Sequence, residues 1–251
     1  MVSAFSGCQL RPVHAERGIL TWDHIRTTIA GKIYYRAQTG LISLENSHNL
    51  AGGTVTPLPV LEEIWQGARD AGLPLHLDGA RIFNAATALG MGAAQLTRGF
   101  DTVMFCLSKG LCAPVGSMIV GSRELIERAR IHRKALGGGM RQVGVLAAAG
   151  LIALEEMPRR LGEDHANARL LAERMASMKG VEIDLESVQT NIVLFKLTDG
   201  GSAAGLAQRL KDKGLLASKV GPNALRFVTH RDVDQAMCER AAAILEEVLQ
   251  I

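Results

Sequence analysis

Two short apolar runs, each ending at a charged residue, constrain the fold of this chain more than any other feature. Residues 73–77 run into Asp78, and residues 102–107 run into Ser108 and Lys109. Short apolar runs bounded by glycine are typical of buried parallel strands. Because ligands of open α/β sheets bind beyond the carboxyl ends of such strands, the pattern predicts a ligand-binding edge that carries an acid and a lysine.

Arg81 follows Asp78 by three residues, so the same edge is expected to carry a guanidinium group. A carboxylate, an amine and a guanidinium together suit pyridoxal phosphate (PLP). Lys109 would form the Schiff base, Asp78 would keep the pyridine nitrogen protonated, and Arg81 would bind a substrate carboxylate. Gly110 is expected to let a bulky ligand approach.

Each of these residues also has an ordinary structural interpretation, which the sequence leaves open. Asp78 could cap the following helix or close an Asp-Gly turn. Arg81 could form a surface pair with it at i, i+3 spacing. Lys109 could simply be a solvent-exposed residue at the end of a strand.

The order of the predicted elements indicates an α/β layer with a largely parallel sheet. A short helix over residues 21–29, capped by Thr21, precedes the first strand of this layer. Strands and helices then alternate. The predicted strands are residues 41–44, 73–77, 102–107 and 116–120, and the helices between them are residues 59–71 and 83–89.

After Gly180 the pattern changes to that of a small α+β domain. We expect a domain boundary near Pro158, which gives a large domain over residues 1–157 and a small C-terminal domain over residues 158–251. Helices are predicted at residues 122–136, 140–154, from Pro158 to about 178, 203–213 and 233–249, and strands at 181–183, 192–195, 215–218 and 225–228.

Composition argues against several classes of partner. With 28 basic and 25 acidic residues and 4% aromatic residues, neither nucleic acid nor an anionic membrane is expected as a partner. The longest apolar stretch, residues 143–154, is too short to span a bilayer, and the N-terminus does not resemble a signal peptide. The four cysteines form no CxxC pair, so we expect reduced, mostly buried thiols, no metal site and a cytoplasmic location.

Other polar residues are candidates with two interpretations. Three glycines, 137–139, lie between the cations Lys134 and Arg141, and this segment is either a flexible turn or an anion-binding loop at a subunit interface. Arg226 lies within an apolar run and needs a partner, either a substrate carboxylate or a structural salt bridge. His48 follows the first strand and is a candidate ring contact or base. His76 and His165 are expected to be hydrogen-bonded core residues.

Several segments, in order along nearly the whole chain, resemble the L-threonine aldolases of the low-specificity or L-allo type. These are PLP enzymes of fold type I, the aspartate-aminotransferase fold. The resemblance implies a mostly parallel sheet with helices on both faces, followed by a small C-terminal α+β domain. The similar segments are residues 44–49, 76–84, 106–111, 113–117, 137–142 and 189–191, among which Ser-Lys-Gly-Leu and Gly-Gly-Gly-Met-Arg-Gln are the most specific motifs.

The resemblance also implies roles for individual residues. Lys109 corresponds to the Schiff-base lysine and Asp78 to the partner of the pyridine nitrogen. Arg81 and Arg226 correspond to ligands of the substrate carboxylate. A homo-oligomer, dimer or tetramer, is implied because two further residues correspond to groups that reach the neighbouring subunit's site; they are Lys134 and Arg141.

The implied reaction cleaves a β-hydroxy-α-amino acid, L-threonine or L-allo-threonine, to glycine and acetaldehyde. A base takes the β-hydroxyl proton while PLP accepts the electrons of the broken Cα–Cβ bond. Family members begin earlier and carry a Gly-Thr phosphate-binding loop and a histidine stacked on the PLP ring, so we expect this chain to be N-terminally truncated. Two alternatives remain: another fold-type-I reaction (transamination, racemisation or β-elimination), or an inactive fragment.

Overall fold

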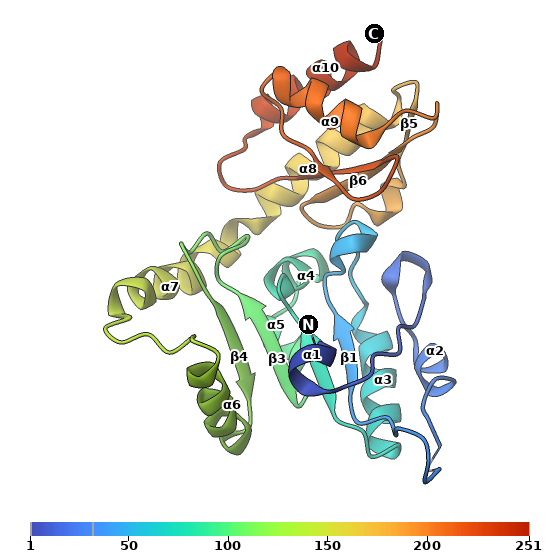
Figure 1. Ribbon diagram of the computed structural model, residues 1–251. Helices are drawn as coiled ribbons and strands as arrows, with labels where there is room; N and C mark the ends of the chain where they lie inside the picture. Colours follow the sequence, from blue (N-terminus) through green and yellow to red (C-terminus); the bar gives the residue numbers. More distant parts are fainter. Residues whose placement is uncertain (1, 32, 251) are drawn as a thin grey trace.

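The computed structural model describes residues 2–31 and 33–250, and its strands form two four-stranded sheets (Figure 1). The first sheet has the order β1–β2–β3–β4. β1 (Ile42–Glu45), β2 (Leu75–Asp78) and β3 (Thr102–Cys106) are parallel, and β4 (Ser117–Gly121) runs antiparallel to β3. The predicted α/β class with a largely parallel sheet is confirmed.

Helices connect the parallel strands, because a parallel pair cannot be joined by a tight turn. α3 (Leu58–Asp70) links β1 to β2, and Pro59 lies in its first turn. Its apolar side, with Leu61, Ile64 and Trp65, is buried. β2 is linked to β3 by α4 (Ile82–Leu89) and α5 (Ala93–Thr97), and α5 was not predicted because its five residues carry too little periodicity.

The first core lies between one face of this sheet and its helices. Side chains of a strand alternate between the two faces, so Ile42, Leu44, Leu75, Leu77 and Val103 point to the same side, where all are buried. Residues of the other face, such as the exposed Ser43, are more accessible. The register therefore fixes which face of the sheet holds the core.

The N-terminal part contributes α1 (Val2–Ser6), the short 3₁₀ helix η1 (Glu16–Gly18) and α2 (Trp22–Arg26). Thr21 caps α2 as predicted, since its hydroxyl accepts the His24 N–H. The helix ends at Arg26 rather than at residue 29. The hydroxyls of Thr27 and Thr28 bond back to the carbonyls of His24 and Ile25, a local alternative to further helix.

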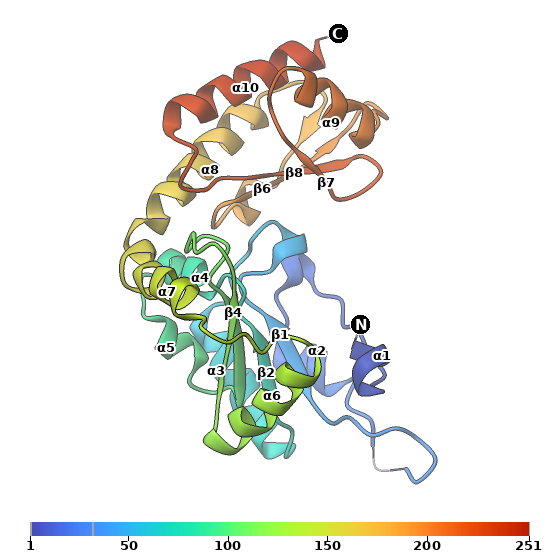
Figure 2. The ribbon, with the colours of Figure 1, turned by 60° about the vertical axis from the view of Figure 1, so that its left-hand side comes forward.

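The second sheet is antiparallel, with the order β5–β6–β8–β7, and lies above the first in Figures 1 and 2. Its core includes the stacked rings of Phe195 and Phe227, whose centroids are 5.3 Å apart. The strands are β5 (Val181–Glu182), β6 (Ile192–Leu197), β7 (Ser218–Lys219) and β8 (Ala224–Val228), packed with α8 (Leu161–Ala176), α9 (Ala203–Asp212), α10 (Gln235–Leu249) and the short η4 (Leu185–Ser187).

The predicted strand at residues 215–218 is wrong in extent, since only Ser218 and Lys219 pair with β8. The Leu215 N–H instead bonds to the Leu210 carbonyl and closes the end of α9. Gly214, with φ of +81°, supplies the left-handed turn that this closure needs. Leu215 packs against the second core instead of extending β7.

The cysteines differ from expectation in their burial. No disulfide links the four thiols within the part of the chain that the structure describes. Only Cys238 is buried, and Cys8 and Cys112 are exposed. Within residues 2–31 and 33–250, no helix has both the length and the apolar composition to cross a membrane.

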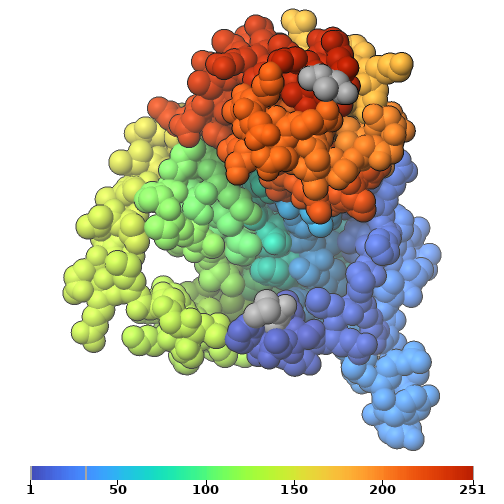
Figure 3. All heavy atoms as spheres, turned by 45° about the horizontal axis from the view of Figure 1, so that its top comes forward, coloured from blue at the N-terminus to red at the C-terminus, as the bar shows by residue number. Residues whose placement is uncertain are grey.

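α6 (Arg123–Ala135) and α7 (Gly144–Glu156) form an arm that stands away from both cores. α6 buries no residue, and α7, which is apolar on all sides, buries only Gly150 and Ala153. In Figure 3 an opening separates this yellow-green arm from the body. β4 and this arm carry several exposed apolar side chains, which are called the outer apolar face below: Met118, Ile119, Val120, Ile131, Val145, Leu151 and Ile152.

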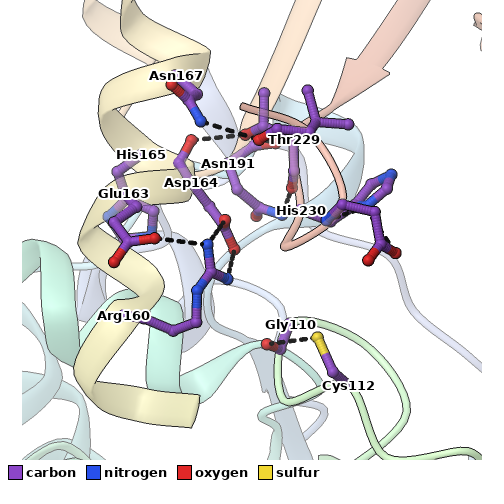
Figure 4. A network of polar contacts seen from close by, with 12 residues as sticks. Gly110, Cys112, Arg160, Glu163, Asp164, His165, Asn167, Asn191, Thr229 and His230 are labelled. Carbon is purple, nitrogen blue, oxygen red and sulfur yellow. Dashed lines mark hydrogen bonds and ion pairs between the residues drawn. The ribbon is translucent and has the colours of Figure 1, made fainter. Parts of the chain in front are cut away.

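A buried ion pair anchors the start of α8 (Figure 4). Asp164, whose side chain is fully buried, accepts from Arg160 at 2.9 Å. Its backbone carbonyl accepts from the Thr229 hydroxyl at 2.6 Å, and Asn191 donates to the Thr229 carbonyl at 2.8 Å. Pro158 lies just before this network, in η3 (Met157–Arg160), and the domain division there stays a prediction.

A further contact region joins the two sheets: the seam between residues 53–55, which follow β1, and residues 189–190. The Val55 N–H donates to Gln189 Oε1 at 2.7 Å, and the Thr190 hydroxyl donates to the Gly53 carbonyl at 2.8 Å. A Cβ at Gly53 would collide with the Thr190 side chain, and its φ of +81° also favours glycine. Residues far apart in sequence are thus held in direct contact.

Two predicted core histidines are hydrogen-bonded and partly buried. His76 Nδ1 lies 2.7 Å from Thr102 Oγ1 on the neighbouring strand. His165 Nε2 lies 3.1 Å from Asn84 Nδ2, which joins α8 to α4. Burial lowers the pKa of His165 to about 4, so the ring is neutral and can accept from the Asn84 amide.

We predict that protonation of His165 destabilises the protein in mild acid. The unfolded chain takes up this proton near pH 6.5, whereas the folded chain resists it until about pH 4. The contribution of the neutral ring is complete above pH 6.5 and declines as the pH falls toward 4. The wild type should be less stable at pH 5 than at pH 7, as measured by urea denaturation. In His165→Gln this loss of unfolding free energy should be smaller by about 1–2 kcal/mol.

His132→Gln is the matched control, because His132 is exposed on α6. It should leave the pH dependence of stability as in the wild type. A His165→Gln protein with the full wild-type pH dependence would contradict the prediction.

Candidate active site

The three parallel strands end at the same edge of the first sheet. β1 ends at Glu45 and β2 at Asp78, and these two residues are paired in register. β3 is parallel to β2 and ends at Cys106, three residues before Lys109. The chain topology therefore brings Asp78 and the loop that holds Lys109 to one edge.

Two arginines, one in the turn after β2 and one in β8 of the second sheet, converge on one side chain at this edge. Arg81 Nη1 donates to Asn49 Oδ1 at 2.9 Å, and Arg226 Nη1 donates to the same oxygen at 2.7 Å. Burial, and then the charge of Arg226, lower the pKa of Arg81. Two cations thus share one neutral acceptor.

The arginine pair lacks an anionic partner within the described residues. Neither Arg81 nor Arg226 forms an ion pair there, so the predicted alternatives of a structural salt bridge for Arg226 and a surface pair of Arg81 with Asp78 are not found. The Nε atom of Arg226 is buried and has no hydrogen-bond acceptor. Because an unsatisfied buried donor is costly, this geometry suits an anionic ligand.

Asp78 closes a turn but caps no helix. Its Oδ1 accepts the Ala80 N–H at 3.1 Å. The N-cap of α4 is Arg81, and no side chain bonds to that helix end. Of the two structural alternatives for Asp78, the turn is observed.

Lys109 is exposed in the loop between β3 and β4. The loop is shaped by backbone hydrogen bonds, including one from the Cys112 N–H to the Lys109 carbonyl at 2.9 Å. Gly110 is also packed closely against its own chain. A Cβ there would lie 3.0 Å from Leu161 Cδ2 and 3.2 Å from Asn84 Oδ1, so internal packing also favours glycine here, and the expected access of a ligand stays a prediction.

His48 lies beside the same edge with a defined hydrogen bond. Its Nδ1 accepts the Ala51 N–H at 3.2 Å, which leaves the proton of the neutral ring on Nε2. Nε2 is 3.9 Å from Glu45 Oε2. In this arrangement His48 can donate at Nε2 and cannot accept a proton there.

Lys134 and Arg141 are exposed and are not brought to the arginine pair. Lys134 is in the last turn of α6, and Arg141 is in the loop before α7. Within the described ranges, neither side chain makes a hydrogen bond or an ion pair with another residue. The predicted roles of Lys134 and Arg141 stay predictions.

Sequence reasoning did not single out Asn49 or Asn84 as site residues. Asn49 is the last residue of the polar stretch that follows β1, which was the available signal. Its partner Arg226 is 177 residues away, so sequence spacing could not reveal the contact. Asn84 is buried in an apolar helix, where an amide generally needs partners.

Comparisons with known proteins show which family the chain resembles. The protein-family model described as "Beta-eliminating lyase" matches residues 1–198. The chain is 40% identical over 238 residues to Low-specificity L-threonine aldolase 1 of Arabidopsis thaliana, covering 92% of this chain and 66% of that protein. It is 40% identical over 236 residues to Low specificity L-threonine aldolase of Escherichia coli K12, covering 94% of this chain and 68% of that one.

Solved structures share the fold at low sequence identity. The crystal structure of a putative L-allo-threonine aldolase from Listeria monocytogenes superposes with a TM-score of 0.80 at 20% identity, covering 98% of this chain and 70% of that one. A threonine aldolase from Leishmania major gives 0.79 at 19% identity, covering 97% and 71%. These likenesses support fold type I.

The chain spans 66% of the Arabidopsis relative and 60% of a second relative from that plant, "Probable low-specificity L-threonine aldolase 2". By the family match over residues 1–198 and by 40% identity to a relative of which it covers 68%, the chain belongs to the beta-eliminating lyase family, in the group that contains the low-specificity L-threonine aldolases.

Proposed function

We propose that the chain acts as a PLP-dependent lyase that cleaves L-threonine or L-allo-threonine to glycine and acetaldehyde. The observation that carries this proposal is the convergence of Arg81 and Arg226 on Asn49 beside the ends of β2 and β3. An amino-acid substrate brings a carboxylate, the group that this pair lacks. The names of the relatives favour threonine as the substrate.

The residues at this edge fit PLP. Asp78 would hold the pyridine nitrogen, Lys109 would attach the cofactor, and Lys134 and Arg141 would reach the cofactor of a neighbouring subunit. When bound, PLP supplies an electron-accepting ring for the charge left at the substrate α-carbon. Burial of a donor without an acceptor, Arg226 Nε, also fits an anionic molecule at this edge.

The protein's own groups would orient the substrate. The two guanidinium groups would hold the carboxylate and so fix the direction of the Cα–Cβ bond. His48 has its proton on Nε2, so we propose it as a hydrogen-bond donor to the ring or the β-hydroxyl, and not as the base in this arrangement. Another residue or a water molecule would take the hydroxyl proton.

We further propose that the chain forms a homo-oligomer, a dimer or a tetramer, in the cytoplasm. The outer apolar face supports an oligomer, because a helix that is apolar on all sides is normally buried. In α7 the Val145 side chain is instead 85% exposed. The same face also favours the second candidate, a non-catalytic fragment that binds a longer homologous subunit.

We predict that Lys109 is needed for cofactor attachment and for cleavage. Incubated with PLP, the wild type should develop the absorbance band of lysine-bound PLP and convert L-threonine to glycine and acetaldehyde. Lys109→Ala should lose both, because within residues 2–31 and 33–250 no other lysine follows a strand at this edge. Lys179→Ala, at an exposed lysine after α8, should lose neither.

The outcome separates the alternatives. Turnover of a keto acid without acetaldehyde would indicate a different PLP reaction. A wild type without the band, or a band that persists in Lys109→Ala, would contradict the proposed role.

The arginine pair should control substrate affinity. Arg81→Met and Arg226→Met each remove a charge-assisted hydrogen bond worth about 1.5–3 kcal/mol, so KM for L-threonine should rise roughly 10- to 100-fold with a smaller change in kcat. Arg240→Met, at an exposed position of α10, is the control for loss of charge. An unchanged KM in both site variants would refute the assignment.

The outer apolar face should determine the oligomeric state. Light scattering of the wild type should give the mass of a dimer or tetramer, and Ile131→Glu with Leu151→Glu should shift it toward the monomer because charges replace apolar contacts. Leu216→Glu, at an exposed leucine outside this face, should leave the measured mass unchanged. A monomeric wild type would contradict the proposed oligomer, and aggregation without PLP would favour the fragment.

A further inference from the structure

Asn49 connects the two sheets at the candidate site. It begins η2 (Asn49–Ala51), directly after the segment that leaves β1. Its Oδ1 accepts from Arg81, which precedes α4 beside the first sheet, and from Arg226, which lies in β8 of the second. The amide oxygen thus accepts from two cations, one beside the first sheet and one in the second.

The position of Asn49 is itself fixed. Its backbone N–H donates to Glu45 Oε1 at 2.8 Å. This bond also engages the Glu45 carboxylate with the backbone, and no hydrogen bond or ion pair joins Glu45 to either arginine within the described ranges. The nearest acid on β1 is therefore used to hold Asn49 in place.

A neutral acceptor has a specific electrostatic consequence at this point. A carboxylate in place of the amide would form charge-assisted bonds to both guanidinium groups and offset their repulsion. An apolar side chain would leave one donor of each arginine without its acceptor. The amide satisfies one donor of each arginine and adds no negative charge to the pair.

We propose that Asn49 is a positioning residue that determines specificity for a carboxylate ligand: it holds Arg81 and Arg226 together while leaving their charge available. The remaining donors, including the buried Arg226 Nε, then await the α-carboxylate of an amino acid. This inference rests on the proposed function, since it assigns the arginine pair to the substrate carboxylate. It adds the residue that sets the spacing and the net charge of that pair.

The test compares Asn49→Asp and Asn49→Ala with the wild type, each loaded with PLP. The measurements are the Tm without ligand and the calorimetric affinity for glycine, which carries the α-carboxylate and has no bond to cleave. Asn49→Asp should raise the Tm, because the new carboxylate pairs with both arginines, and should weaken glycine binding at least tenfold. Asn49→Ala should lower both the Tm and the affinity.

Asn223→Asp is the matched control, since it adds the same charge in the exposed turn before β8 and should not weaken glycine binding. An Asn49→Asp protein that binds glycine within twofold of the wild type would overturn the inference, whatever its Tm. So would a wild type that binds no glycine. A wild type that binds glycine tenfold better than Asn49→Asp but does not cleave L-threonine would contradict the proposed function and uphold the inference.

Discussion

The parallel pairing of β1, β2 and β3 is the constraint on which the candidate site depends. In-register parallel strands end together, so Glu45, Asp78 and the loop after Cys106 leave the sheet at one edge. The burial of alternating apolar residues on one face prevents a slip of one residue, which would turn the core residues to the other face. The chemistry at the edge is therefore fixed by the packing of Leu44, Leu77 and Val103 beneath it.

Two charge arrangements in this protein differ in whether an acidic side chain pairs with the arginine. Arg160 and Asp164 form a compensated pair, and the Asp164 carbonyl is also bonded to Thr229. Arg81 and Arg226 share a neutral amide and retain their net charge. The first arrangement has the features of a structural element, because both carboxylate oxygens of Asp164 accept from Arg160. The second has an unused donor, which is a feature of a binding site.

Most of the fold could be predicted from local pattern. The strands of the first sheet and α3 have clear apolar periodicity and stop signals, and their observed bounds lie within about two residues of the predicted ones. Errors occurred where short-range polar bonds compete with that pattern. Threonine hydroxyls end α2 early, and the closure of α9 takes Leu215 away from β7.

The candidate site was less predictable, because its decisive contact joins residues distant in sequence. The charged residues at the strand ends could be found from the sequence, since each follows an apolar run. That Arg226 would bond to Asn49 could not, since their proximity depends on how the two sheets pack. The close packing of Gly110 against Leu161 and Asn84 could not be predicted either, because all three residues are distant in sequence.

The seam between residues 53–55 and 189–190 affects how the geometry of this site can change during evolution. By sequence the segment after β1 belongs to the first sheet, yet it is fastened to the loop before β6 by Gln189 and Thr190. A replacement in that loop would be transmitted to the guanidinium groups as an altered separation. The geometry of the arginine pair can thus drift through changes at positions outside the candidate site.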